Sequence, residues 1–249
     1  LNAIIIIVLH IKNTFTKQMI GEKMVYQNIA EAKFISRPNR FIAYIDINGN
    51  KEICHVKNTG RCKELLVPDA KIFVQKADNE ARKTKYDLIT VCKGDRLVNI
   101  DSQAPNKVFM EWVQKSSLFK NIARIQPEYN YKDSRFDFYI EADNKKALIE
   151  VKGVTLEENG VVMFPDAPTE RGVRHINHLC KCVREGYDAY VVFVIQMSNV
   201  KYFTPNVKTH KAFGDALKTA AKSKVNIIAF DCDITENSIV ARDFVEVRL

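Results

Sequence analysis

Two neighbouring segments decide the fold of this chain: SRFDFYIE at residues 134–141 and KALIEVKGV at residues 146–154. Both are rich in β-branched and aromatic residues, so we predict two adjacent strands. Side chains two residues apart on a strand point to the same face. This spacing places Asp137 on one face of the first strand and Glu150 with Lys152 on one face of the second.

The three polar side chains converge if the two faces agree. Two carboxylates that meet repel each other unless a cation lies between them, and oxygen ligands select a hard ion such as Mg²⁺ or Mn²⁺. We therefore predict Asp137 and Glu150 as metal ligands, with Lys152 at an attacking water or a phosphate. Glu128, at a similar depth on the preceding strand, is expected to supply a further carboxylate. The alternative is a solvated strand face of alternating charges.

The flanking sequence alternates between strand and helix patterns. Strands are predicted at 123–131, 189–196 and 225–231, and helices at 106–120, 171–186 and about 209–223. The run AYVVFVIQ is continuously apolar, which is typical of a strand buried on both faces. Residues 99–249 are thus predicted to form an α/β domain with a mixed central sheet.

Upstream, short strands and tight turns dominate. FIAYIDI and KEICHVK flank Asn48-Gly49, a pair that favours a hairpin turn because both residues tolerate positive φ. Further strands are predicted at 71–77 and 86–93. We predict a small barrel of the oligonucleotide-binding (OB) type over residues 24–98. A plain β-barrel without a ligand is the alternative.

The charge balance favours a polyanionic partner. The net charge is +8, and residues 24–96 hold 14 basic against 9 acidic side chains, whereas residues 97–249 hold 21 against 20. The basic surplus therefore lies mainly upstream of the predicted catalytic half. Such a surplus attracts nucleic acid, although it also occurs on ordinary solvated surfaces.

At these motifs the chain resembles a known family. SRFDFYIE followed by ALIEVKGVTL resembles the core of the PD-(D/E)XK nuclease superfamily, and the whole pattern resembles the sugar fermentation stimulation protein A family. The supporting motifs follow in order over roughly residues 24–249: RPNRFIAYIDI, HVKNTGRCKELL, RKTKYDL, APNKVF, SRFDF, EVKGVTL, FPDAPTERGVRHINHL and GYDAYVVFVIQ. Asp69 stands where the family usually has glycine.

The resemblance implies an N-terminal OB barrel joined to a nuclease-like α/β domain. It further implies DNA binding, with DNA favoured over RNA, and a link to the expression of sugar (maltose) metabolism genes. No sugar-binding motif accompanies this link in the sequence.

Candidate nucleic-acid contacts lie in both halves. In the barrel they are Arg37, Asn39, Arg40, Phe41, His55, Lys57, Asn58 and Arg61. On the helix predicted at 171–186 they are Arg171, Arg174, His175 and His178, with Asp166 and Thr169 expected to cap or orient its first turn. The alternatives are a core role for Phe41, polar groups that only satisfy turns, and arginines paired with Glu170 or Glu185.

The remaining features constrain location. The apolar run at residues 3–9 is too short to span a bilayer, which takes roughly 20 residues, and no cleavage site follows it. We expect residues 1–23 to be an over-extended reading of the gene or a disordered leader. The six cysteines show no zinc-site spacing, so we expect reduced thiols and a cytoplasmic protein without a membrane partner.

Three functional hypotheses follow. The first is a nuclease that uses Mg²⁺ or Mn²⁺, and the second is a DNA-binding regulator that keeps the nuclease fold without catalysis. The third, an interaction scaffold, explains neither the polar trio nor the basic barrel. Metal-dependent cleavage would distinguish the first, and salt-sensitive binding without turnover the second.

Overall fold

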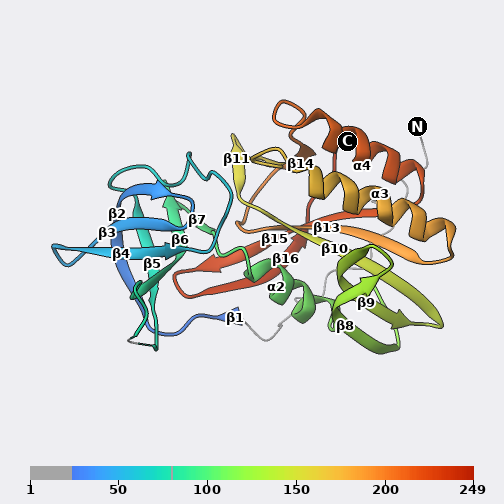
Figure 1. Ribbon diagram of the computed structural model, residues 1–249, viewed down its shortest axis with the longest axis horizontal. Helices are drawn as coiled ribbons and strands as arrows, with labels where there is room; N and C mark the ends of the chain where they lie inside the picture. The colour runs from blue at the N-terminus through green and yellow to red at the C-terminus, as the bar shows by residue number, and fades with distance from the viewer. Residues whose placement is uncertain (1–23, 80) are drawn as a thin grey trace.

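The computed structural model describes residues 24–79 and 81–249, so the predicted leader at 1–23 lies outside the described residues. Two β-rich halves lie side by side along the long axis of the molecule (Figure 1). The smaller half is built from strands between residues 29 and 99, and the larger half carries the helices found among the described residues. This arrangement confirms the predicted mixed α/β class with a barrel followed by an α/β sheet.

The small half is a closed barrel. Its strands are β2 (Ile29–Asn39), β3 (Ile42–Ile47), β4 (Asn50–Val56), β5 (Lys71–Lys76), β6 (Tyr86–Lys93) and β7 (Arg96–Asn99). They follow the order β4-β3-β2-β5-β6-β7, and a parallel pairing of β4 with β6 closes the ring. This is the OB-type barrel that the short strands predicted.

Turn chemistry sets the register of the barrel strands. The β3–β4 hairpin turns at Asn48 and Gly49, whose φ angles are +52° and +81°. The Asp46 carboxylate accepts a 2.8 Å hydrogen bond from the Gly49 N–H, which closes the turn. Asp69 also has a positive φ, +64°, a conformation that glycine enters without strain. A glycine would therefore fit this position well.

The large half is organised around a seven-stranded sheet. Its order is β1-β16-β15-β13-β10-β9-β8. The strands are β1 (Met24–Val25), β8 (Ile122–Tyr131), β9 (Ser134–Ala142), β10 (Lys145–Val154), β13 (Asp188–Ile195), β15 (Asn226–Thr235) and β16 (Ser238–Phe244). The central strands β10, β13 and β15 are parallel, and the outer pairings are antiparallel. β1 adds to this sheet beside β16.

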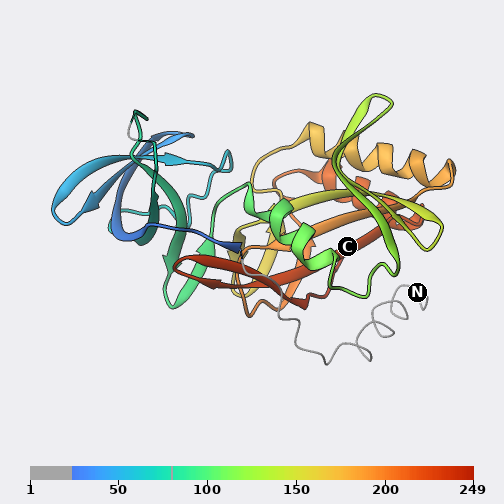
Figure 2. The same cartoon turned by 90° about the horizontal axis from the view of Figure 1, so that it is seen from below.

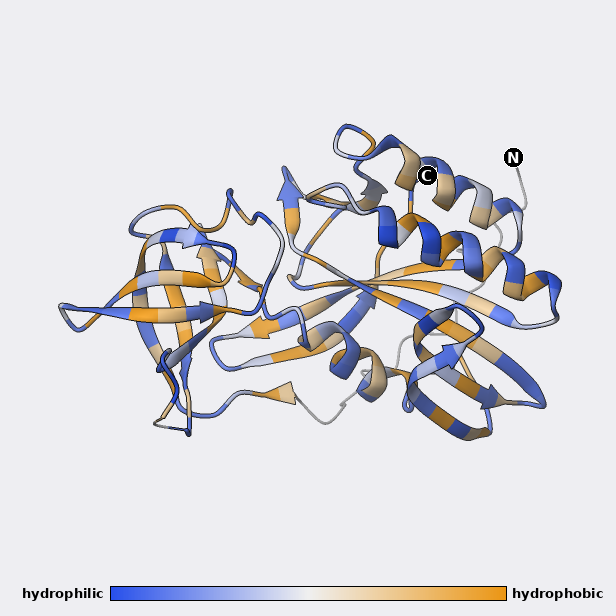
Figure 3. Ribbon diagram, in the orientation of Figure 1, coloured by the Kyte–Doolittle hydropathy of each residue, from blue (hydrophilic) through white to orange (hydrophobic). Residues whose placement is uncertain are grey.

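Helices cover both faces of the sheet (Figure 2). Helix α2 (Ala104–Val113) packs on one face, and α3 (Glu170–Arg184) with α4 (Lys211–Lys222) on the other. Hydrophobic and hydrophilic bands alternate along α3 and α4 (Figure 3), as expected for helices with one buried face. A smaller sheet of β11 (Leu156–Glu158), β12 (Val161–Phe164) and β14 (Tyr202–Pro205) lies near the barrel.

Helix α2 is shorter than the helix predicted at 106–120 and ends at Val113. The hydroxyl of Ser116 donates to the Val113 carbonyl at 3.1 Å and accepts from the Leu118 N–H at 3.3 Å. Such local side-chain bonds compete with helix continuation. Among the described residues, no helix is long and apolar enough to cross a membrane.

Candidate active site

The site begins where two neighbouring strands separate. The pairing of β9 with β10 ends at Phe138 and Ile149. One residue further on, the Asp137 carboxylate accepts a 2.7 Å hydrogen bond from the backbone N–H of Val151. The side-chain amide of Asn106, in the first turn of α2, donates to the other Asp137 oxygen at 3.1 Å. The carboxylate thus replaces the missing strand partner and is held from two sides.

Glu150 lies inside the sheet at the centre of the site. It is 2% exposed and sits on β10 between β9 and the parallel strand β13. Its Oε1 accepts hydrogen bonds from the Lys152 ammonium and, at 2.6 Å, from Nδ1 of His175. Its second oxygen, Oε2, is buried and has no hydrogen-bond partner among the described residues. A buried carboxylate oxygen without a donor is costly unless another group coordinates it.

The two carboxylates differ in their electrostatics. Burial and the nearby Glu150 charge raise the pKa of Asp137 above its ordinary value. Burial also acts to raise the pKa of Glu150, but Lys152 and His175 outweigh it and hold that pKa below the ordinary value. Glu150 is therefore kept ionised by its contacts with Lys152 and His175, while the ionised form of Asp137 is disfavoured. Additional positive charge between the two carboxylates would favour the ionised form of Asp137.

Helix α3 delivers His175 to the site. Thr169 caps the helix, because its hydroxyl accepts a 3.1 Å hydrogen bond from the Gly172 N–H, as predicted. Nε of Arg171 donates to Nε2 of His175 at 3.4 Å, which leaves the Nδ1 hydrogen for Glu150. His175, predicted as a phosphate contact, is therefore placed against the metal-ligand candidate.

Glu128 lies across from Asp137 on the edge strand β8. The register pairs Pro127 with Phe138 and Tyr129 with Phe136 on either side of it, and its φ is +53°. Its exposed carboxylate pairs with Nε of Arg135 at 2.9 Å. The structure thus puts Glu128 beside the site but turns its carboxylate to a surface ion pair.

The predicted barrel contacts divide into two groups. Arg37 is a structural residue, since its guanidinium donates to the carbonyls of Arg40, Asn58, Gly60 and Arg61 at 2.6–2.9 Å. The side chains of Asn39 and Asn58 accept from backbone N–H groups in their own turns. Arg40 and Arg61 are exposed and remain free to meet a ligand.

His55 and Lys57 share a carboxylate that the sequence analysis did not single out. Asp87 is 5% exposed and lies 3.3 Å from His55 and 3.0 Å from Lys57. Arg82 completes the cluster with two hydrogen bonds, 2.6 and 3.2 Å long. In the sequence, the cluster could have been suspected only from the motif RKTKYDL, which contains both Arg82 and Asp87.

On the outer side of α3, Arg174 is exposed, whereas His178 is bonded to the Ser134 hydroxyl. The acidic residues expected as alternative partners of Arg171 and Arg174 form ion pairs with other residues. Glu170 pairs with His210 at 3.1 Å and Glu185 with Lys132 at 2.5 Å. Arg171 and Arg174 therefore keep charge at the surface of the helix that carries His175.

The residues present fit a divalent ion as a two-carboxylate site. Among the described residues no group of three or more His, Cys, Asp or Glu side chains is arranged as a complete ligand set. The Glu150 charge nevertheless helps to raise the pKa of Asp137, and Glu150 Oε2 has no hydrogen-bond partner among the residues that the structure describes. Oxygen donors of this kind suit Mg²⁺, Mn²⁺ or Ca²⁺, which keep water in part of their shell.

Comparison with known proteins identifies the family. The model for the sugar fermentation stimulation protein RE domain matches residues 103–238, and the model for the SfsA N-terminal OB domain matches residues 35–100. The chain belongs to the sugar fermentation stimulation protein family. The resemblance to this family found in the sequence motifs is thereby confirmed.

Relatives in the sugar fermentation stimulation protein family align over nearly their whole length. The homolog from Clostridium beijerinckii is 62% identical over 226 residues, covering 91% of this chain and 100% of the relative. The Clostridium kluyveri homolog is 49% identical, covering 90% and 99%. A solved structure described as Pyrococcus furiosus SfsA in complex with Ca²⁺ has a TM-score of 0.83 and 28% identity, covering 91% of this chain and 98% of that chain.

Several polar contacts join the OB and RE regions of this chain. The Asp166 carboxylate, after the cis Phe164–Pro165 bond, accepts a 2.7 Å hydrogen bond from the Arg61 N–H. The buried Glu157 carboxylate pairs with Lys93 at 2.6 Å and with Arg96 at 3.1 Å. The first contact places barrel loop 58–61 beside the segment that leads into α3.

Proposed function

We propose that this protein binds nucleic acid, with DNA preferred over RNA, and cleaves phosphodiester bonds with Mg²⁺ or Mn²⁺. The observation that carries the proposal is the buried Oε2 of Glu150, which has no hydrogen-bond partner in the described part of the chain, together with the Asp137 carboxylate, whose pKa the Glu150 charge helps to raise, and the Lys152 ammonium bonded to Glu150. Two carboxylates and an ammonium group at one point suit charge stabilisation at a phosphate.

Asp137 and Glu150 are the residues that would hold the ion. A divalent ion in such a site lowers the pKa of bound water and stabilises charge on a phosphoryl oxygen. The Pyrococcus furiosus relative, described in complex with Ca²⁺, supports the expectation that this fold takes an oxygen-preferring cation.

The surrounding residues have separate roles in the proposal. His175 fixes the orientation of Glu150 through Nδ1, and Asn106 with the Val151 N–H fixes Asp137. Such contacts to ligand side chains hold them in place. Lys152 carries the positive charge that a phosphate or attacking water would meet. Glu128 is proposed to contribute only after leaving its pair with Arg135.

The nucleic acid is proposed to lie along the basic groups of both halves. Arg40 and Arg61 on the barrel, and Arg171 and Arg174 on α3, are exposed. Exposed basic side chains bind phosphates with an affinity that falls as salt rises. We place the protein in the cytoplasm, where its six unpaired cysteines would stay reduced.

Cleavage assays test the proposal. Purified protein is incubated with labelled single- and double-stranded DNA and RNA in Mg²⁺, Mn²⁺ or EDTA. We expect metal-dependent cleavage that Asp137→Asn and Lys152→Met abolish while nucleic-acid affinity stays within about twofold. The matched control is Asp133→Asn at an exposed turn, which should cleave like the wild type. Absence of cleavage with every substrate and metal would refute the nuclease.

A non-catalytic DNA-binding regulator is the second candidate. It is favoured by the surroundings of Glu150, because the Lys152 ammonium already neutralises its charge without a metal and His175 donates a hydrogen bond to the same oxygen. The names of the relatives refer to stimulation of sugar fermentation, in keeping with control of sugar-metabolism genes. Salt-sensitive binding without turnover in Mg²⁺ and Mn²⁺ would favour this candidate.

A further inference from the structure

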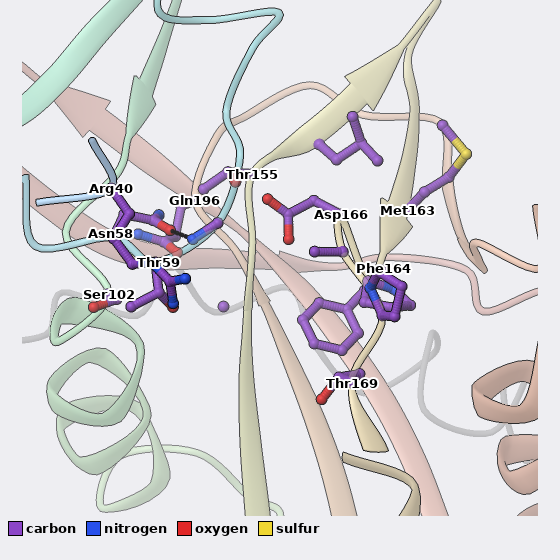
Figure 4. Close-up of a pocket in the computed structure, with 16 residues that line it drawn as sticks. Arg40, Asn58, Thr59, Ser102, Thr155, Met163, Phe164, Asp166, Thr169 and Gln196 are labelled. Carbon is purple, nitrogen blue, oxygen red and sulfur yellow. Dashed lines mark hydrogen bonds between the residues drawn. The ribbon is translucent and has the colours of Figure 1, made fainter. Parts of the chain in front are cut away.

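A cleft lies between the barrel and the α/β half and has no role in the site described above. Its volume is about 420 Å³, within the roughly 300–1,000 Å³ of small-molecule sites. Arg40, Asn58 and Thr59 approach it from the barrel side, and Phe164, Asp166 and Thr169 face them from the opposite side (Figure 4). We propose that this cleft receives one unpaired nucleobase of a single strand that continues into the active site. This inference rests on the nucleic-acid binding proposed above.

The cleft and the active site are built from the same three elements. Gly153 on β10 and Thr155 just after the strand line the cleft, one and three residues beyond Lys152. Ser102 lines it just ahead of α2, whose Asn106 holds Asp137. Thr169 lines it and caps α3, whose His175 holds Glu150. A nucleotide in the cleft would therefore be a close neighbour of the phosphate at the trio.

The chemistry of the cleft suits a base better than a phosphate. The Asp166 carboxylate is held in place by the Arg61 N–H and would repel a phosphate, but it can accept hydrogen bonds from the amino or imino groups of a base. The Phe164 ring is fixed by tilted contacts with Phe213 at 5.1 Å and Phe193 at 5.9 Å. Aromatic rings at such places stack on bases without regard to sequence.

Basic groups lie at the edge of the cleft, where phosphates would run. Arg40 lines the cleft and is exposed, Arg61 follows the lining residue Gly60 and is exposed, and Arg171 lies on the first turn of α3. A base inserted between these groups must leave its stack and its pairing partner. Since extracting a paired base costs a few kcal/mol, the cleft favours single strands, frayed ends or unpaired positions over intact duplex.

Oligonucleotides that carry 2-aminopurine test the inference in EDTA, so that cleavage plays no part. The fluorescent base is moved through successive positions of a single strand. We expect a fluorescence change at one position in the bound complex, and an abasic site there should weaken binding by about tenfold, the loss of a hydrogen bond to a charged group. A uniform response across positions, or unchanged affinity for the abasic strand, would overturn the inference.

Two variants probe the cleft by different routes. Asp166→Asn keeps an acceptor for Arg61 but changes the pattern offered to the base, so the affinity difference between intact and abasic strands should shrink by about tenfold. Thr59→Trp should fill the cleft from the exposed rim without altering Asp166. Asp95→Asn, an exposed site on the β6–β7 turn, is the matched control and should behave as the wild type.

The outcomes separate this inference from the proposed nuclease. A position-specific signal that both variants remove, without Mn²⁺-dependent cleavage, would support the base-binding cleft and refute the nuclease. Metal-dependent cleavage with a uniform 2-aminopurine response at all positions would support the nuclease and refute the base-binding cleft. Displacement of the strand by nucleoside monophosphates at equal concentration would overturn the assignment to a strand, since the cleft would then serve free nucleotides.

Discussion

The Asp137 carboxylate accepts a hydrogen bond from the Val151 N–H at 2.7 Å, at the point where β9 and β10 part. A buried backbone N–H without an acceptor is rare because it forfeits its bond to water. The carboxylate therefore allows the sheet to open without this penalty. The side chain that we propose as a metal ligand is also part of the backbone hydrogen bonding.

Substitution of Asp137 should separate these two roles. Asp137→Ala leaves the Val151 N–H without its acceptor and should lower the free energy of unfolding by about 1–3 kcal/mol. Asp137→Asn keeps an acceptor and removes the repulsion from Glu150 that raises the Asp137 pKa, so its stability should equal or exceed the wild type. Urea unfolding at pH 7 measures both. Equal stability of the two variants would contradict the structural role.

Metal binding should stabilise the fold. At a free Mn²⁺ concentration 100 times Kd, the added stability is about 2.7 kcal/mol, which corresponds to a rise in Tm of roughly 5–10 °C. Glu150→Gln should abolish most of this rise because it removes one anionic ligand. Asp133→Asn, at an exposed turn outside the site, serves as a comparison and should keep it. An equal rise in Tm on adding Mn²⁺ to all three proteins would show that the ion binds elsewhere.

Two neighbouring arginines of the barrel should respond in opposite ways. Arg37→Met removes a guanidinium that donates to four carbonyls and should cost about 1.5–3 kcal/mol of stability. Arg40→Met, at an exposed position, should change stability by less than about 0.5 kcal/mol yet weaken nucleic-acid binding and its salt dependence. Thermal unfolding and fluorescence anisotropy at several salt concentrations test the pair.

The Asp87 cluster should make the barrel sensitive to acid. Burial acts to raise the Asp87 pKa, but Arg82 and Lys57 outweigh it and lower the pKa to about 2 from the ordinary 3.8. A lowered folded-state pKa gives stability that is fully present above about pH 4 and is lost as pH falls toward 2. Asp87→Asn should cost on the order of 2 kcal/mol at pH 7 and flatten this acid slope. Urea unfolding of the wild type and of Asp87→Asn from pH 2 to 7 measures this. The same dependence of unfolding free energy on pH in both proteins would contradict a stabilising role of the cluster.

Gly60 should couple the barrel to the α/β half. A Cβ at this position would lie 2.4 Å from Oδ2 of Asp166 and 2.8 Å from Oδ1 of Asn58. Gly60→Ala should therefore push Asp166 away from the Arg61 N–H and destabilise the protein by about 1–3 kcal/mol. In an Asp166→Ala background the same change should cost less, which a double-mutant cycle measures. Additive effects would show that the two residues are not coupled.

Much of the fold could be predicted from local pattern. The strands at 41–47, 86–93 and 189–196 were recognised because alternation or continuous apolar runs reflect burial directly. The end of α2 at Val113 could not be predicted, because the hydrogen bonds of the Ser116 side chain that end the helix leave no periodic pattern in the sequence. The small sheet of β11, β12 and β14 was also missed, since strands of three or four residues are too short to show a period.

The candidate site could be predicted only in part. Strand periodicity brought Asp137, Glu150 and Lys152 together, and the structure places Glu150 in contact with Lys152. His175 lies 25 residues beyond Glu150 in the chain and was expected to face phosphate. Its partner depended on how α3 packs on the sheet, which helical spacing alone does not determine.

The sequence by itself determined the local elements: the hairpin at Asn48-Gly49, the alternating strands and the D-x12-E-x-K trio. These follow from φ preferences and side-chain periods within a few residues. Tertiary structure alone decided that Asp137 bonds Val151 where the strands part, and that Asp166 meets Arg61 across the two halves. Contacts between distant segments depend on register, crossing and packing, which no local pattern specifies.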